Sequence, residues 1–294
     1  MSGPLLLKHL AREVLSWRTP QRTPEPVLLM DDPAQVDGYE RAGHEDGPML
    51  PTYLLHTLHL CQMIRPGEQV VDLACGPANL LCQVARLNPR AQFLGIDLAG
   101  NMLRRAQDNA QRQELTNIRF MHGDITRVAE VANRSADLVM STLSLHHLPD
   151  TGLLEACFDE IARIVKPGGA VYLADLGRLK HEATVQFVAS WEAERHPPLY
   201  TIDFLNSMRA AFPVQTLRQA SRRLTFLPGL KLLHTFLVPF MVVIKTPARH
   251  ALPSSAATAC RQLWQNMSPS QQGDFEGLRR FFGWGGLRSP HPSA

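Results

Sequence analysis

The chain has 294 residues, of which 45% are hydrophobic and 19% are charged, so it can bury a large core. Its net charge of +3 is a mild imbalance that does not by itself indicate a nucleic-acid partner. Five cysteines, an odd number without a C-x-x-C pair, argue against a disulfide framework and favour reduced thiols. The first leucines are interrupted by Lys8, and no later apolar run reaches membrane length, so we expect neither a signal peptide nor a membrane span. These observations predict a cytoplasmic protein with no membrane partner.

The N-terminal part of the chain predicts two helices separated by a break. Residues 5–17 have apolar side chains at helical spacing and predict a short amphipathic helix. The stretch TPQRTPEP, residues 19–26, is a proline-rich break that is too polar for the core. Residues 49–67 predict the next helix, which stops at a Pro-Gly pair. We assign residues 1–49 to an N-terminal helix and a lid segment.

Five apolar strand candidates follow, with helical stretches between them, at residues 69–75, 92–98, 118–124, 136–142 and 170–176. Such alternation predicts a parallel sheet covered by helices on both faces. Two further β-prone runs, 230–236 and 240–246, predict a sixth and a seventh strand at an antiparallel edge. The expected fold class is α/β: a doubly wound, seven-stranded, mostly parallel, Rossmann-like sheet with an antiparallel last strand, plus helical N-terminal and cap additions.

Residues 181–196 and 203–212 predict two helices of a cap on the substrate side. We therefore expect a main domain at residues 50–246, with the cap inserted at 180–228, and a C-terminal extension at 247–294 with one helix around 261–267. The aromatic side chains of the cap are candidates for a substrate wall or for the cap's own core: Trp191, Tyr200, Phe204 and Phe212. A basic run is either a solvated helix face or an anion-recognition site: Arg209, Arg218, Arg222 and Arg223.

Acidic and small polar residues stand where the predicted strands end. In an open, doubly wound sheet, ligands bind at the carboxyl ends of the strands. Asp72 to Gly76 follow the first strand, Asp97 ends the second, and Asp124 ends the third. Asp97 lies 21 positions after Gly76 (97 − 76), the spacing at which an acidic residue accepts hydrogen bonds from the hydroxyls of a bound ribose. The sequence therefore predicts a nucleotide site at this edge.

Five motifs occur in order along the chain: VVDLACGPA, GIDLAGNML, HGDIT, ADLVMSTLSLHHLPD and IARIVKPGGAVYLADL. In this order the chain resembles the class I S-adenosylmethionine-dependent methyltransferases, of the small-molecule type similar to methyltransferase domains 11 and 25. The resemblance covers residues 50–178 and extends more loosely to about 246. It implies S-adenosyl-L-methionine as the cofactor.

The resemblance also implies a role for each matching residue. The methionine end of the cofactor is assigned to Asp72, Ala74 and Gly76, and the ribose to Asp97, with Met102 packing nearby. The adenine is assigned to Asp124 and to the amide of Ile125. Ser141 and Thr142 would flank the methyl donor, and Tyr39 would touch the methionine carboxylate, with His44 entering the site from the same lid. His146 and His147 are the candidate catalytic bases.

Each of these residues also has a simpler structural interpretation. Asp72 fits a helix N-terminal charge, Asp124 a turn former, and Met102 a core residue. The lid segment fits a solvated loop, and His146 and His147 fit residues that only shape their loop. No group of His, Asp and Glu has metal-ligand spacing in the sequence, so we expect no metal.

The resemblance predicts methyl transfer to a small-molecule acceptor by in-line displacement, with no nucleic-acid partner and a monomer or homodimer as the assembly. A nicotinamide dehydrogenase would require G-x-G-x-x-G after the first strand, where Pro77 fits poorly. A protein or RNA methyltransferase of the amino-methylating type would carry N/D-P-P-Y/F after the fourth strand, where this chain has Ser141-Thr142-Leu143-Ser144. A catalytically inactive, cofactor-binding partner subunit stays open as an alternative.

The loop after the first strand carries one glycine, Gly76, where the related family usually has three. Alanine tolerates close approach of a ligand but disfavours a positive φ. We therefore expect only Gly76 to need the left-handed region, and Ala74 and Ala78 to have ordinary φ values.

Overall fold

The computed structural model describes residues 3–17, 19–26, 29–43, 47–190 and 198–292. His44 and Trp191, which the sequence singles out, lie outside these ranges. Within them, none of the helices has the length and apolar character needed to cross a membrane.

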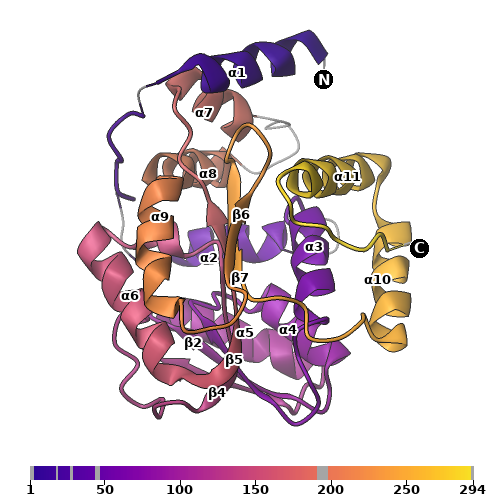
Figure 1. The fold of residues 1–294 in the computed structure, drawn as a ribbon. Coiled ribbons are helices and arrows are strands. Elements are labelled where there is room, and N and C mark those ends of the chain that lie inside the picture. The colour runs from indigo at the N-terminus through magenta and orange to yellow at the C-terminus, as the bar shows by residue number, and fades with distance from the viewer. Residues whose placement is uncertain (1–2, 18, 27–28, 44–46, 191–197, 293–294) are drawn as a thin grey trace.

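A seven-stranded sheet forms the centre of the described structure, with the strand order β3-β2-β1-β4-β5-β7-β6 (Figure 1). Strands β1 to β5 are parallel, and β7 runs antiparallel to both of its neighbours. The bounds are β1 Gln69–Leu73, β2 Gln92–Asp97, β3 Ile118–His122, β4 Ala136–Thr142, β5 Val165–Leu176, β6 Lys231–His234 and β7 Met241–Lys245. The predicted fold class, with its antiparallel last strand, is confirmed.

The sheet is covered on both faces because its central strands are apolar on both sides. In β1, Val70 packs into one core cluster and its neighbour Val71 into another, since successive side chains of a strand point to opposite faces. The first cluster draws on α3 Leu50–Leu60, α4 Asn79–Leu87, α5 Gly100–Arg112, α10 Ser254–Asn266 and α11 Pro269–Trp284. The second cluster draws on α6 Thr151–Ile164 and α9 Val214–Ala220.

Four helices stand around the carboxyl edge of the sheet and build a roof over it. They are α1 Gly3–Leu15, α2 Pro33–Ala42, α7 Glu182–Ala189 and α8 Pro198–Ala210. Helix α1 lies across α7 at one end of the molecule, and α2 contacts α8 (Figure 1). Residues 19–26 contain neither helix nor strand, as the sequence predicts, and connect α1 to the lid.

The lid and the C-terminal segment contain more helix than the sequence predicts. Helix α2 begins after Asp32, whose carboxylate accepts hydrogen bonds from the amides of Ala34 and Gln35, with Pro33 in the first turn. Helix α10 includes the predicted helix around 261–267, whereas α11 is not foreseen. Helix α11 packs on α3 and buries Phe275 and Phe282 completely in the first core cluster.

Candidate active site and cofactor cleft

The loop between β1 and α4 runs through the left-handed region three times. The backbone angle φ is 55° at Gly76, 58° at Ala74 and 61° at Ala78. The expectation that both alanines have ordinary φ values is therefore wrong. A left-handed alanine costs about 1–2 kcal/mol, but the surrounding hydrogen bonds impose this path, including the bond from the Cys75 amide to the Ile96 carbonyl at 3.0 Å.

Asp97 ties the end of β2 to this loop. Its Oδ2 accepts a hydrogen bond from the Gly76 amide at 2.7 Å, and its Oδ1 accepts one from the Ala99 amide at 2.9 Å. Burial raises the pKa of this carboxyl, although the two amide hydrogen bonds act in the opposite direction. Each carboxylate oxygen can accept a further hydrogen bond. The geometry therefore leaves Asp97 able to receive two donors from a ligand over the loop.

Asp72, the residue before the end of β1, has an unsatisfied oxygen. Its side chain is buried, and Oδ1 has no hydrogen-bond partner among the described residues. Burial, and then the nearby Asp97 charge, raise the pKa of the Asp72 carboxyl well above its usual value. A buried acceptor without a partner is rare in folded proteins. A ligand that brings a cationic donor, such as an amino group, fits this atom.

The other predicted cofactor residues have structural roles that the geometry shows directly. Asp124 Oδ1 accepts hydrogen bonds from the amide and the hydroxyl of Thr126, both at 2.8 Å, as in a turn, and Ile125 is buried. Ser141 is buried, and its hydroxyl donates to the Leu73 carbonyl at 2.7 Å. The adenine contacts of Asp124 and Ile125 and the methyl-donor contact of Ser141 stay predictions.

Tyr39 on α2 lies against the β1 loop. A Cβ placed on Gly76 would lie 3.9 Å from Tyr39 Cε1, and Met102 belongs to the small apolar cluster against which Tyr39 packs. Burial raises the pKa of the Tyr39 hydroxyl to about 12.

Ion pairs fix the helix that carries Tyr39. Glu40 pairs with Arg105 at 2.9 Å and with Arg112 at 2.8 Å, which joins α2 to α5. Asn79, at the start of α4, donates to the Glu40 carbonyl at 3.0 Å. The lid helix is therefore attached both to the loop below it and to the helix beside it.

His146 and His147 lie in the short helical turn after β4, η1 Leu145–His147, and differ in how they are held. The His146 imidazole Nδ1 is 2.6 Å from Asp175 Oδ1, and its backbone amide donates to Asp175 Oδ2 at 2.8 Å. Both side chains of this pair are almost completely buried. Burial lowers the pKa of His147 well below its usual value, so that this imidazole is neutral.

Arg22 clamps this turn from the segment that precedes the lid. Its guanidinium donates to the carbonyl oxygens of His146, Leu148 and Pro149, and its Nε donates to that of Ala210 on α8. The guanidinium also lies 4.0 Å over the Phe212 ring. One side chain thus joins the β4 turn to the cap.

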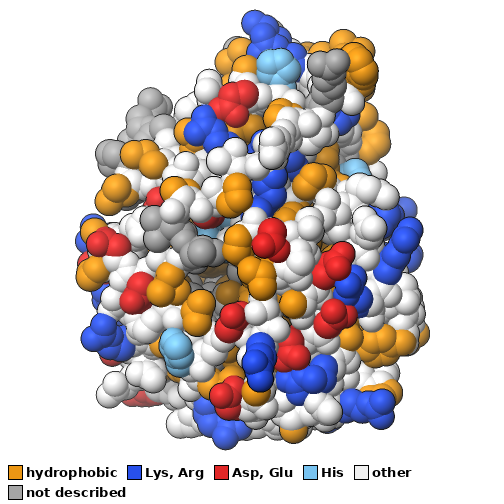
Figure 2. All heavy atoms as spheres, turned by 90° about the vertical axis from the view of Figure 1, so that its left-hand side faces the viewer, with side chains coloured by type: hydrophobic (Ala, Val, Ile, Leu, Met, Phe, Trp, Pro, Cys, Tyr) orange, Lys and Arg blue, Asp and Glu red, His pale blue; other side chains and the backbone are white. Residues whose placement is uncertain are grey.

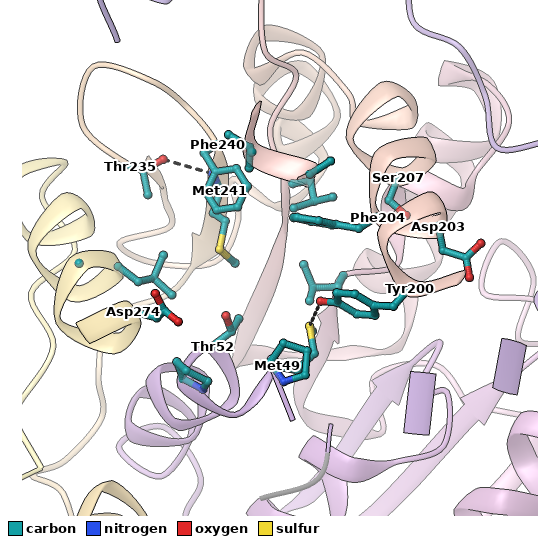
Figure 3. A pocket seen from close by; sticks show the side chains of 18 of the residues that line it. Met49, Thr52, Tyr200, Asp203, Phe204, Ser207, Thr235, Phe240, Met241 and Asp274 are labelled. Atoms are coloured by element: carbon teal, nitrogen blue, oxygen red, sulfur yellow. Dashed lines mark hydrogen bonds between the residues drawn. The ribbon is translucent and has the colours of Figure 1, made fainter. Parts of the chain in front are cut away.

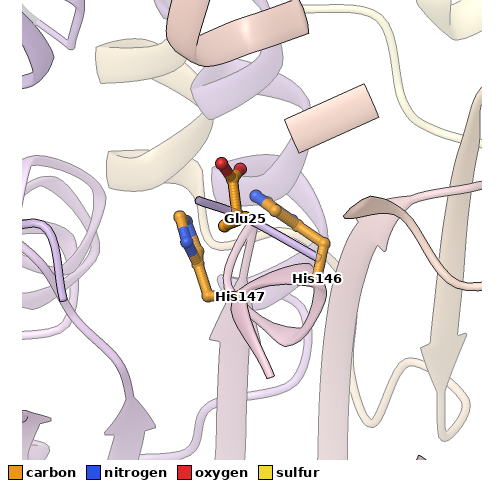
Figure 4. Close-up of side chains that lie close together, drawn as sticks. All are labelled: Glu25, His146 and His147. Carbon is orange, nitrogen blue, oxygen red and sulfur yellow. The ribbon is translucent and has the colours of Figure 1, made fainter. Parts of the chain in front are cut away.

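Glu25, three residues further on, reaches the same turn. One carboxylate oxygen of Glu25 and one imidazole nitrogen from each of His146 and His147 lie within 4.8 Å of one another. Figure 4 shows the His146 ring pointing toward the Glu25 carboxylate. The Ser207 hydroxyl donates to Glu25 Oε1 at 2.7 Å. Burial raises the pKa of Glu25, and the Ser207 hydrogen bond partly offsets this.

A cavity of about 580 Å³ opens beside these groups. Its walls come from the lid, the cap, α11 and the strand ends, and are mostly apolar, with Met49, Phe204, Phe240 and Met241 prominent (Figure 3). Tyr200 donates from its hydroxyl to Met49 Sδ at 3.3 Å across one wall. The cavity is also lined by the residues that face the cofactor edge, namely Tyr39, Leu143, His146 and His147.

The cap residues that the sequence singles out divide into two groups. Tyr200 and Phe204 line the cavity, whereas Phe212 is buried beneath Arg22 and does not line it. In the basic run, Arg209 pairs with Glu182, and Arg223 pairs with two acids of α6 at 2.8 and 2.7 Å. On the face shown in Figure 2, basic and acidic side chains alternate, without a continuous basic patch.

A family profile described as a methyltransferase domain matches residues 64–225, more than half of the chain. The chain belongs to the class I S-adenosylmethionine-dependent methyltransferases. This methyltransferase is 32% identical over 166 residues to a ubiquinone biosynthesis O-methyltransferase from Albidiferax ferrireducens, covering 53% of this chain and 63% of the relative. It is 34% identical over 116 residues to a demethylmenaquinone methyltransferase from Desulfitobacterium hafniense, covering 39% and 44%. The matches thus span less than two thirds of the length of each of these relatives.

Solved structures share the fold of this methyltransferase at low sequence identity. The plantazolicin methyltransferase BpumL, solved with SAH and a monoazolic desmethylPZN analog, aligns with a TM-score of 0.54 at 12% identity, covering 81% of this chain and 87% of that one. A SAM dependent methyltransferase from Aquifex aeolicus aligns with a TM-score of 0.50 at 13% identity, covering 73% and 97%. These likenesses support the sheet topology described above.

Sequence reasoning missed three residues of the site in this methyltransferase. Asp175 is predicted only as part of an apolar strand, although it is the last residue but one of β5, as Asp72 is of β1, and that position is the available signal. Arg22 and Glu25 lie in a segment interpreted as a polar break, and both are half-buried against the β4 turn. Nothing in the local sequence indicates that residues 19–26 pack against the β4 turn, because the hydrogen-bond partners of Arg22 and Glu25 lie more than 120 positions away in the chain.

Proposed function

We propose that this methyltransferase transfers a methyl group from S-adenosylmethionine to a small-molecule acceptor bound in the cavity. One observation carries the proposal: Tyr39 lies against the Gly76 loop and also lines the cavity, next to the two histidines that follow β4. The cofactor loop and the acceptor space therefore share a wall. This is the arrangement that in-line transfer between two bound molecules requires.

The residues at the strand ends fit the cofactor. The unpartnered Asp72 oxygen would accept from the cofactor's amino group, and Asp97 would accept from the ribose hydroxyls while it keeps its two amide hydrogen bonds. Asp124 and the Ile125 amide are assigned to the adenine. When bound, S-adenosylmethionine supplies an electrophilic methyl group on a sulfonium.

The cavity favours a largely apolar small molecule. Its volume of about 580 Å³ lies within the range of roughly 300–1,000 Å³ found for small-molecule sites. Several walls come from α1, α2, α7 and α8, which roof the strand ends, so the cavity lies between this roof and the edge of the sheet and is partly open to solvent. The matches to a ubiquinone biosynthesis O-methyltransferase and to a demethylmenaquinone methyltransferase agree with an acceptor of this kind.

His146 is the residue that we assign to the acceptor's proton. Its Nδ1 faces Asp175 Oδ1 at 2.6 Å, so a proton held there leaves the Nε2 lone pair for the cavity side. An acceptor hydroxyl would donate to this nitrogen, and Asp175 would keep the ring in the required orientation and tautomer. His147 lies beside it, is neutral because burial lowers its pKa, and shapes the same wall.

Labelled transfer tests this proposal directly. The protein is incubated with methyl-labelled S-adenosylmethionine and a cell extract separated into small-molecule, protein and RNA fractions. We expect label in the small-molecule fraction with the wild type and with Asp108→Ala, an exposed control on α5, and a large loss with Asp97→Ala. Label in protein or RNA would support a macromolecular acceptor instead, and no label in any fraction would support an inactive cofactor-binding subunit.

A further inference from the structure

We propose that Glu25, His146 and His147 form a binding site for a divalent transition-metal ion, with Zn²⁺ the ion that their chemistry suits best. The three side chains come from two segments more than 120 positions apart and bring one ligand atom each to within 4.8 Å of the others (Figure 4). The sequence predicts no metal because this spacing does not resemble any ligand motif. The site exists only because residues 19–26 fold against the β4 turn.

The ligand set is the kind that catalytic zinc sites use. Two imidazole nitrogens and one carboxylate oxygen give three protein ligands, which leaves a further position for water or substrate. All three groups are acceptors when His146 and His147 are neutral and Glu25 is ionised. A cation between these three atoms would be coordinated by all of them at once.

A supporting shell orients two of the three ligands. Asp175 holds His146 Nδ1 at 2.6 Å, which directs the opposite nitrogen, Nε2, toward Glu25. A carboxylate behind a histidine ligand in this way is the usual partner of metal-bound imidazole. The Ser207 hydroxyl occupies one oxygen of Glu25 at 2.7 Å, and the second oxygen is left for the ion.

The nearby Arg22 does not take the place of a metal ion. Its guanidinium donates to four backbone carbonyl oxygens, and no ion pair joins it to Glu25 in the part of the chain described. Arg22 fixes the turn that carries the two histidines and so holds the ligands in position. Its positive charge also favours the ionised form of Glu25, against the larger effect of burial on the pKa of that carboxyl.

The open side of the site faces the cavity. His146, His147 and Ser207 all line it, so that the remaining coordination positions of a bound ion would point toward the acceptor. This part of the inference rests on the proposed function. With the ion bound, His146 Nε2 is a ligand and no longer accepts the acceptor's proton, so the base role assigned to it above applies to the metal-free protein. An acceptor with a hydroxyl or carbonyl oxygen would bind the ion through that oxygen, and a metal-bound hydroxyl loses its proton to water more readily than a free one.

Zinc titration calorimetry of chelator-treated protein tests the site. We expect one Zn²⁺ per wild-type chain and at least a 100-fold lower affinity for both Glu25→Gln and His147→Gln. Asp175→Asn removes the supporting carboxylate and should weaken binding by about 10–100-fold. The exposed His122→Gln variant is the matched control and should bind as the wild type does. Absorption of bound Co²⁺ in the visible region provides an independent readout of the same ligand changes.

Absence of Zn²⁺ binding to the wild type, or equal binding to every variant, would overturn the proposal. Binding of S-adenosylhomocysteine, measured on the same samples, shows that each variant is folded. It also separates the two proposals: S-adenosylhomocysteine binding without Zn²⁺ binding refutes the metal site alone, whereas the reverse refutes the proposed function and leaves the metal site standing.

Discussion

Asp175 holds His146 through two hydrogen bonds, one to the imidazole Nδ1 at 2.6 Å and one from the backbone amide at 2.8 Å. The acid is the last residue but one of β5 and the histidine follows β4, two strands that are adjacent in the sheet. Because both contacts go to one carboxylate, the ring and its backbone are fixed together. The pair therefore sets the orientation and tautomer of the imidazole that faces the cavity.

Asp175→Asn should lower kcat for methyl transfer by about 100-fold or more, the range that a positioned acid or base contributes. The amide retains the shape of the carboxylate but does not stabilise a positively charged imidazole, so the pH dependence of kcat should change as well. Binding of S-adenosylhomocysteine should not change, because Asp175 is not among the residues assigned to the cofactor. Asp108→Asn is the exposed control, and a kcat that stays within a factor of three of the wild type in Asp175→Asn would exclude this role.

Arg22→Lys should lower the free energy of unfolding by about 2 kcal/mol. A lysine ammonium does not reproduce the planar fork that reaches four carbonyl oxygens on the β4 turn and α8, and some of these buried acceptors lose their donor. Chemical denaturation measures the change, with the exposed Arg41→Lys as the control. A decrease in the free energy of unfolding that is no larger for Arg22→Lys than for Arg41→Lys would show that these hydrogen bonds do not contribute to stability.

The stability of the protein should fall as the pH is lowered below about 6.5. Burial lowers the pKa values of His56 and His59 to about 3, and the neighbouring Lys245 adds to the effect on His59. The unfolded chain then binds more protons than the folded one between about pH 6.5 and 3. The contribution of the two neutral histidines to the free energy of unfolding is therefore fully present above this window and is lost as the pH falls through it. Each histidine contributes about 1.4 kcal/mol per pH unit.

Replacement of both histidines by glutamine should make this pH dependence shallower. Glutamine does not titrate, yet it retains a polar group near Tyr172 and Ser289, the partners of His56 and His59 at 2.8 and 2.6 Å. Melting temperatures between pH 5 and 8 measure the slope, and the exposed His122→Gln is the control. An unchanged slope in the double variant would assign the acid sensitivity to other groups.

Replacement of alanine by glycine in the loop after β1 should have the opposite effect on the free energy of unfolding from the same replacement in a helix. Ala74→Gly removes a left-handed alanine and should raise the free energy of unfolding by up to about 1 kcal/mol, whereas Gly76→Ala should lower it by about 1 kcal/mol. Ala162→Gly, inside α6, is the matched control and should cost about 1 kcal/mol. Destabilisation by Ala74→Gly as large as that of the control would contradict the strain assigned to this loop.

The sheet was predictable because its signals are local. Continuous apolar runs such as QVVDL and ADLVMST have no polar face, so each indicates a strand buried on both sides, and the intervening helices dictate parallel pairing. The acids at 72, 97 and 124 were found from the same signal, their place at strand ends. The left-handed alanines were not, because φ at Ala74 and Ala78 is imposed by the surrounding hydrogen bonds rather than by alanine itself.

The substrate side was less predictable because its contacts are non-local. Arg22 and Glu25 have ordinary polar surroundings in sequence, and only the folded chain brings them against His146 and Ser207. Helix α11 shows the same limit, since its glycines and charges weaken the helical pattern although Phe275 and Phe282 are fully buried. Contacts between residues far apart in the sequence determine both the position of Arg22 and Glu25 and the formation of α11.

Titration calorimetry with S-adenosylhomocysteine tests the central claim most directly. The wild type and the exposed control Asp108→Ala should bind one molecule per chain with equal affinity. Asp97→Ala should bind at least about 100-fold more weakly, because it loses two hydrogen bonds to a charged acceptor, which contribute about 1.5–3 kcal/mol each. Unfolding curves of the three proteins confirm that the loss is not one of folding. Equal binding by Asp97→Ala and the wild type, or no binding by the wild type, would contradict the assignment of this edge to the cofactor.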